Sequence, residues 1–208
     1  KNFFNGENVI TFLSSTIRSK YSFNKNIIIF ESSNSRVNNS KINYNGMIST
    51  NPFDLNLDIN LSDYKIANIF DMNSILIEFI KTGLLFDENI SANNLITLNS
   101  NIKEEIFQEA RIKIIIKNGK INLNETIFVN KRIGSLEFKN SRLFFENKNL
   151  KLNSDIMIKI KDPNKLFAFL LTSKKARKPI KNILVNLDYD FSTNLIKFNN
   201  VIIDDKKI

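Results

Sequence analysis

Apolar and polar residues alternate with a period of two over most of this 208-residue chain. In the clearest stretch, Leu55, Leu57, Ile59 and Leu61 alternate with Asp or Asn residues. The same alternation recurs at Ile112, Ile114 and Ile116, at Ile121 and Leu123, at Ile127 and Val129, at Leu136 and Phe138, at Leu150 and Leu152, at Ile156, Ile158 and Ile160, at Ile183, Val185, Leu187 and Tyr189, and at Ile196, Phe198, Val201 and Ile203. Successive side chains of a β-strand point to opposite faces, so the pattern predicts a mainly β protein whose strands each have one apolar face.

Short turn sequences rich in Asn separate these stretches. They are Asn118-Gly119, Asn140-Ser141, Asn147-Lys148-Asn149, Ser192-Thr193-Asn194 and Asn199-Asn200. Asn and Gly tolerate the left-handed backbone conformation that tight hairpin turns require. Such short connections favour antiparallel neighbours and leave no room for the crossover that parallel neighbours need. We therefore predict a long meandering antiparallel sheet.

The N-terminal quarter has a less regular pattern, with many Asn and Ser residues between Ser32 and Ser40. Apolar residues still cluster in three places there. We predict strands over Val9 to Ser15, Ile27 to Glu31 and Ile42 to Ile48.

Two segments break the alternation and predict short helices. Asp71 to Leu85 has apolar residues at helical spacing, an Asp as N-cap and Gly83 as a stop signal. Asp162-Pro163 combines a capping Asp with Pro at the first helical position, and apolar residues continue to Leu171. The stretch from Ile102 to Ala110 is compatible either with a third helical turn or with a loop that enters the next strand.

The residue types that most enzyme active sites need are missing or isolated. The chain has no Cys and no His, which removes thiolate nucleophiles, most zinc ligands and the commonest proton shuttle. Three acidic pairs are present, and we interpret each as a solvated surface: Asp54 with Asp58, Asp188 with Asp190, and Asp204 with Asp205. The five Gly residues are too scattered for a phosphate-binding loop. We expect no enzymatic activity, no metal site and no cofactor.

The net charge of +9 raises the question of nucleic-acid binding. Most cations, however, stand singly on alternating positions opposite an apolar row, as on a solvated sheet face. Binding of single-stranded nucleic acid also needs aromatic residues interleaved with cations, whereas Phe138, Phe145 and Phe198 belong to apolar rows. We therefore expect no nucleic-acid partner.

One basic cluster follows the second predicted helix, at Lys174, Lys175, Arg177, Lys178 and Lys181. An apolar helix that ends in cations is able to lie on an anionic membrane surface. Cations at a helix C-terminus also complement the helix dipole without any further role. Both interpretations stay open, and the first makes Lys174, Lys175, Arg177 and Lys178 candidate membrane-surface residues.

A sheet with one apolar face has to cover that face with a second sheet, with helices or with a ligand. The chain offers only two short helices, so we predict one β-rich unit over residues 1–208 whose sheet is curled into an elongated groove. The alternative is a structural or adhesive β-sandwich with a self-packed core. We also interpret the chain as a segment of a longer protein. No apolar run in it approaches the length that crosses a bilayer.

The chain resembles the AsmA-like family over Ser40 to Asp205. The resemblance lies in the strand, Asn-Pro-Phe turn and strand from Asn45 to Leu61, in the hairpins from Ile112 to Ile160 with the turn Lys117-Asn118-Gly119-Lys120-Ile121, and in the Asp162-Pro163 helix followed by Ile183 to Ile203. It implies a protein of the Gram-negative envelope, with a periplasmic body and an inner-membrane helix outside this segment.

The wider AsmA and TamB group is implicated in moving phospholipid and in outer-membrane integrity or assembly, and it supplies no catalytic residues. The resemblance and the apolar rows together lead to a non-enzymatic lipid-binding module as the main hypothesis. Its partner is a phospholipid or another acyl-chain lipid. The candidate lipid-groove residues are Leu55, Leu57, Ile59, Leu61, Ile112, Ile114, Ile116, Ile156, Ile158 and Ile160.

Overall fold

The computed structural model describes residues 2–38, 40–67, 80–102 and 105–207. The strands are β1 (Phe4–Phe12), β2 (Ser15–Phe23), β3 (Ile27–Val37), β4 (Ser40–Thr50), β5 (Phe53–Ser62), β6 (Ile90–Asn99), β7 (Glu109–Lys117), β8 (Lys120–Asn122), β9 (Ile127–Asn130), β10 (Gly134–Glu146), β11 (Asn149–Ile160), β12 (Asn182–Asp190), β13 (Leu195–Ile203) and β14 (Lys206–Lys207). The helical elements are α2 (Pro163–Phe169) and the short 3-10 helices η2 (Leu84–Phe86) and η3 (Lys174–Ala176).

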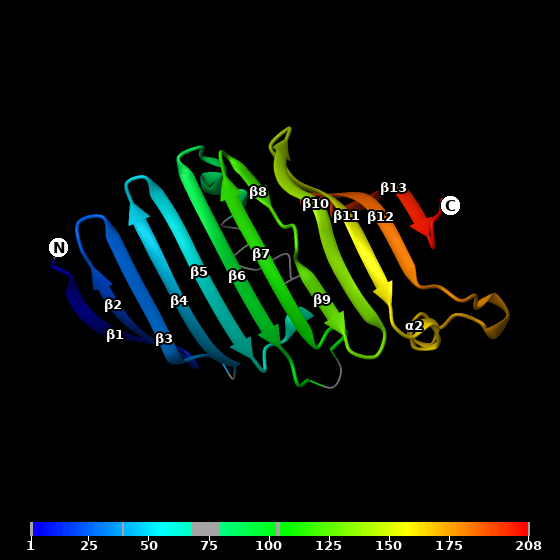
Figure 1. Ribbon diagram of the computed structural model, residues 1–208, viewed down its shortest axis with the longest axis horizontal. Helices are drawn as coiled ribbons and strands as arrows, with labels where there is room; N and C mark the ends of the chain where they lie inside the picture. Colours follow the sequence, from blue (N-terminus) through cyan, green and yellow to red (C-terminus); the bar gives the residue numbers. More distant parts are fainter. Residues whose placement is uncertain (1, 39, 68–79, 103–104, 208) are drawn as a thin grey trace.

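All fourteen strands belong to one long sheet, which confirms the mainly β prediction. The strands lie side by side in sequence order, from β1 at one end to β13 and β14 at the other (Figure 1). The exception is β9, which pairs with both β7 and β10. Strand β8 pairs with the same two strands, further along each of them. The described strands thus form one hydrogen-bonded sheet and not two separate sheets.

The pair β5–β6 is parallel, and this corrects the prediction of a purely antiparallel meander. Phe53 pairs with Ile90 and Ser62 with Asn99, so the chain returns to the starting end of β5 before β6 begins. A parallel pair needs a long crossover connection, and residues 63–89 supply it. No turn sequence marks this crossover. Most of the helix predicted over Asp71 to Leu85 falls on residues 68–79, which lie outside the described residues.

The predicted Asn turns have two different outcomes. Asn118-Gly119 and Asn147-Lys148 are two-residue hairpin turns with positive φ at both positions, as predicted. The Ser192-Thr193-Asn194 turn joins β12 to β13. Asn140 and Asn199 instead lie inside β10 and β13, where the pairing register shifts. Asn serves there as the extra residue of a bulge, so each strand continues through a sequence that resembles a turn.

The N-terminal strands are longer than predicted, and β2 (Ser15–Phe23) has no counterpart among the predicted strands. Strand β9 differs in another way, because its inward residue is Phe128 and not Ile127 or Val129. Three consecutive apolar residues make the alternation ambiguous in such a short strand.

The helix predicted at Asp162-Pro163 is confirmed as α2. The Asp162 carboxylate accepts hydrogen bonds from the backbone N–H groups of Asn164 and Lys165, at 2.9 and 3.2 Å. The helix ends at Phe169, two residues before the predicted limit. In the stretch from Ile102 to Ala110, residues 105–108 form a loop that leads into β7, as one of the two interpretations predicted. Among the described residues, no helix has the length and apolar character needed to cross a membrane.

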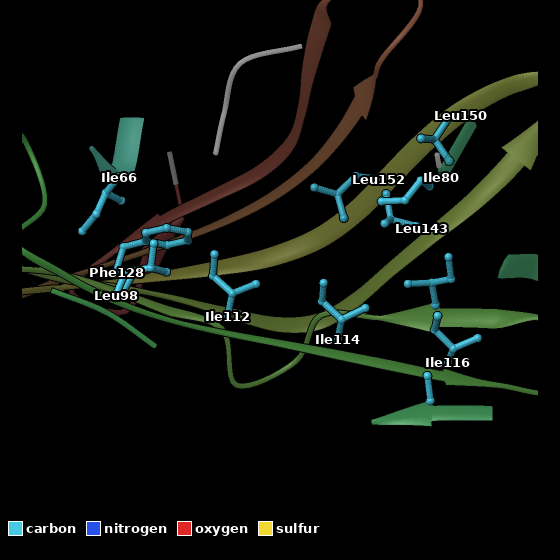
Figure 2. Packing of buried hydrophobic residues seen from close by; sticks show 13 residues of the cluster. Ile66, Ile80, Leu98, Ile112, Ile114, Ile116, Phe128, Leu143, Leu150 and Leu152 are labelled. Carbon is cyan, nitrogen blue, oxygen red and sulfur yellow. The ribbon is translucent and has the colours of Figure 1, made fainter. Parts of the chain in front are cut away.

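The buried core lies in the middle of the sheet. It combines residues of β6, β7, β8, β9, β10 and β11 with two residues of the crossover, Ile66 and Ile80. Figure 2 shows Ile66 close to Leu98 and Phe128, and Ile80 close to Leu143, with Ile112 and Ile114 between these two groups. The described crossover residues Ile66 and Ile80 therefore lie on the face of the sheet from which the strands project their apolar residues.

Candidate functional site

One row of apolar side chains crosses almost the entire sheet. Residues that face each other on neighbouring strands share a face, and the register connects Phe4, Phe23, Ile28, Ile48, Leu55, Ala92, Ile116, Ile121, Leu143, Leu152, Tyr189 and Ile196. We call this set the apolar row. Each of its residues comes from a different strand, and none of them is charged.

The same face is apolar toward the other ends of the strands as well. A second set of facing residues is Ile42, Leu61, Leu98, Ala110, Phe128, Leu136, Ile158, Ile183 and Ile203. The opposite face of the sheet is mainly polar: Lys20, Glu31, Asn45 and Asp58 face one another there. The sheet therefore has an apolar face and a polar face, as the alternation predicted.

Burial divides the apolar row into a sealed middle and two open ends. Ile116 in the middle is only 3% exposed, whereas Ile196 at the C-terminal end is 54% exposed. At the N-terminal end, Phe4 and Phe23 are exposed as well. The described crossover residues Ile66 and Ile80 belong to the core cluster that seals the middle. The open parts lie where no described residue covers the sheet.

The ten predicted groove residues all lie on the apolar face, but they differ in burial. Ile112, Ile114, Ile116 and Ile156 are buried by the rest of the chain. The other six are half-buried, and they are Leu55, Leu57, Ile59, Leu61, Ile158 and Ile160. The centre of the predicted groove is thus filled by the protein's own core. Accessible residues of the apolar row lie toward β1, where the alternation is less regular, and toward β13.

Aromatic rings dominate the open N-terminal end. The rings of Phe4 and Phe23 lie 5.6 Å apart, and the ring of Tyr21 lies 6.3 Å from that of Phe23. Tyr21 covers Gly6 on the neighbouring strand, and a Cβ atom at Gly6 would overlap its ring. A glycine opposite an aromatic residue lets the ring lie flat on the sheet. The Tyr21 ring therefore lies against the backbone at Gly6, next to the ring of Phe23.

The predicted membrane-surface residues follow α2, in the connection from β11 to β12. Lys174, Lys175 and Lys178 are exposed, and Arg177 is half-buried. The Arg177 guanidinium Nε donates a hydrogen bond to the backbone carbonyl of Thr172 at 3.1 Å. Arg177 therefore fixes the loop, and the other three cations project from it.

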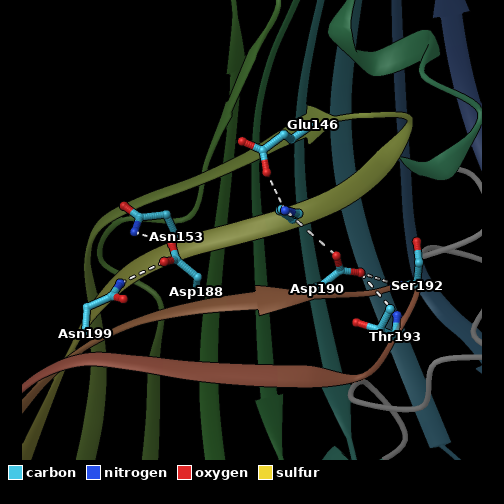
Figure 3. A network of polar contacts seen from close by, with 8 residues as sticks. Glu146, Asn153, Asp188, Asp190, Ser192, Thr193 and Asn199 are labelled. Atoms are coloured by element: carbon cyan, nitrogen blue, oxygen red, sulfur yellow. Dashed lines mark hydrogen bonds and ion pairs between the residues drawn. The ribbon is translucent and has the colours of Figure 1, made fainter.

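The acidic pair Asp188 and Asp190 belongs to a polar network on the polar face (Figure 3). Asp188 accepts hydrogen bonds from the side-chain amides of Asn199 and Asn153, both at 2.8 Å. Asp190 accepts from the backbone N–H groups of Ser192 and Thr193 in the turn that follows. Both carboxylates accept hydrogen bonds from donors of the protein itself, so they take part in the structure of this strand face and its turn.

These hydrogen bonds predict how stability changes with pH. The amide donors of Asn199 and Asn153 lower the pKa of Asp188 from its usual value. A carboxylate with a lowered folded-state pKa stabilises the protein above its unfolded-state pKa of about 3.9, and this contribution is lost as the pH falls through the folded-state value. Urea unfolding of Asp188→Asn should therefore be less sensitive to acid below about pH 4 than that of the original protein. Equal pH dependence of the two midpoints would contradict this role.

No group of three or more acidic residues that could hold a metal ion occurs within the described ranges. Comparison of the chain with protein-family models, with curated proteins and with solved structures found no match. The resemblance to the AsmA-like family therefore stays a prediction.

Proposed function

We propose that the protein is a non-enzymatic lipid-binding module. In this proposal the acyl chain of a phospholipid or similar lipid lies along the open N-terminal end of the apolar row, formed by Phe4, Phe23, Ile28, Ile48 and Leu55. We call these five residues the open strip. The observation that carries the proposal is the continuity of this strip over five neighbouring strands, with exposed aromatic residues at its outer end.

The dimensions of the open strip support an acyl chain as its occupant. Neighbouring strands lie about 4.8 Å apart, so five strands span about 19 Å. One leaflet of a bilayer has a hydrocarbon thickness of about 15 Å, so the strip is long enough for one extended acyl chain. An exposed apolar surface of this kind is typical of binding sites.

The proposed mechanism is passive. Each methylene group of the chain that leaves water contributes about 0.8 kcal/mol. Because the strip has no charged residue to hold a headgroup, a lipid bound there is free to move along the row. The proposal includes the cell envelope as the location, on the basis of the AsmA-like resemblance.

Native mass spectrometry of the purified protein tests this function. We expect adducts with the masses of acyl lipids, which dissociate on collisional activation, and renewed adducts after the delipidated protein is incubated with phospholipid. A folded protein that carries no lipid and takes up none would contradict the proposal and favour the structural or adhesive alternative.

A further inference from the structure

The loop after α2 has one Leu residue in the left-handed backbone conformation and three exposed apolar side chains. Its end has the hydrogen bonds of a Schellman motif, from Thr172 N–H to the carbonyl of Phe167 and from Leu171 N–H to the carbonyl of Ala168. The residue directly before Thr172 takes the left-handed conformation in this motif, and Gly is the usual choice. Here it is Leu171, with φ of 53°.

Leu171 gains no packing inside the protein from this position, because it is 91% exposed. Its neighbours Phe169 and Leu170 are also exposed, while Phe167 is buried and attaches the helix to the rest of the chain. Three consecutive large apolar side chains thus project into solvent. Their backbone is held by the Schellman hydrogen bonds on one side and by Arg177 on the other.

The charge next to these apolar residues has a single sign. From Pro163 to Leu187 the sequence contains six Lys or Arg residues and no Asp or Glu. Lys174, Lys175 and Lys178 are exposed, and none of the three forms an ion pair with any residue that the structure describes. We call the segment from Phe169 to Lys178 the α2–η3 loop. It extends beyond the end of β11, where the sheet does not cover it (Figure 1).

We propose that the α2–η3 loop docks on the surface of an anionic lipid bilayer. Phe169, Leu170 and Leu171 would enter the boundary between headgroups and acyl chains, and the adjacent cations would contact lipid phosphates. The apolar side chains suit the boundary with the acyl chains, and the unpaired cations suit the anionic headgroups above it. This surface is separate from the open strip, and the proposal does not depend on acyl-chain binding there.

Flotation of the 208-residue chain with vesicles tests this proposal. We expect binding to vesicles of phosphatidylcholine mixed with phosphatidylglycerol, and much weaker binding to phosphatidylcholine alone. Replacing Lys174, Lys175 and Lys178 by Gln should weaken binding to the anionic vesicles about 100-fold, on the basis of about fivefold per cation near an anionic surface.

Leu171→Gly is the sharper variant, because Gly suits the left-handed position and should not lower the melting temperature. Loss of the apolar side chain should weaken anionic-vesicle binding about tenfold. Leu13→Gly is the matched control: Leu13 is 85% exposed, has φ of 52°, and has no Lys or Arg within four residues. We expect its binding to be unchanged.

Three results would overturn the docking proposal. The first is equal binding of the original protein to anionic and neutral vesicles. The second is unchanged anionic-vesicle binding by a folded Leu171→Gly variant. The third is an equal loss of binding in Leu171→Gly and Leu13→Gly, which would place the contact away from the loop.

Discussion

Replacing Phe23 by Asp is expected to weaken acyl-lipid binding by a factor of about 10 to 100. Phe23 lies in the open strip between Phe4 and Ile28. Burial of a Phe side chain against an apolar ligand contributes about 1.5–3 kcal/mol, and about 1.4 kcal/mol corresponds to a factor of ten in affinity. A carboxylate at this position adds a desolvation cost. The lipid adducts counted by native mass spectrometry should fall accordingly.

The sheet itself offers a matched control for Phe23→Asp. Ile29 lies on the adjacent strand, on the opposite face, and is 44% exposed compared with 41% for Phe23. Ile29→Asp therefore adds the same charge at a similar exposure, outside the open strip. We expect this variant to bind lipid as the original protein does. Equal loss of lipid in both folded variants would contradict a site on the apolar face.

Replacing Ile116 by Ala is expected to destabilise the fold by about 2–5 kcal/mol, the range for removal of a buried Ile side chain. Ile116 belongs to the same apolar row as Phe23, but it lies in the sealed middle, within the core cluster. The free energy of unfolding, measured by urea denaturation, should fall without a change in lipid binding by the folded protein. Within one row, Phe23 is thus expected to contribute to lipid binding and Ile116 to the stability of the fold.

The control for Ile116→Ala is the same substitution at the open C-terminal end of the row. Ile196 faces Tyr189 and is largely exposed, so Ile196→Ala should change the free energy of unfolding by less than about 0.5 kcal/mol. Similar small losses for Ile116→Ala and Ile196→Ala would show that the middle of the row is not sealed.

The sheet could be predicted well from the sequence because its signal is local. Alternation at Leu55 to Leu61 and at Ile112 to Ile116 records which side chains share a face, and the register confirms it. The Asn118-Gly119 turn and the Asp162 cap are also local, since a few neighbouring residues determine each. Asn140 and Asn199 show the limit of such signals, because Asn suits a bulge as well as a turn.

The parallel pair β5–β6 and the cover over the middle of the sheet could not be predicted in this way. Pairing Phe53 with Ile90 depends on contacts between distant segments, and no turn sequence announces it. The burial of Ile114 likewise depends on a cluster that brings together residues of six strands and two residues of the crossover. A half-covered apolar face has the same alternation as an open one. The alternation therefore locates the apolar face but not its accessible part.

Fluorescence quenching tests most directly whether an acyl chain touches the open strip. The chain contains no Trp, so Phe23→Trp introduces a single indole within the strip, and Ile29→Trp places the same reporter on the polar face. We predict that a fatty acid brominated on its acyl chain quenches the indole fluorescence of the Phe23→Trp variant in a saturable way and leaves that of the Ile29→Trp variant unchanged. Equal quenching of both variants, or quenching of neither, would contradict an acyl-chain site on the open strip.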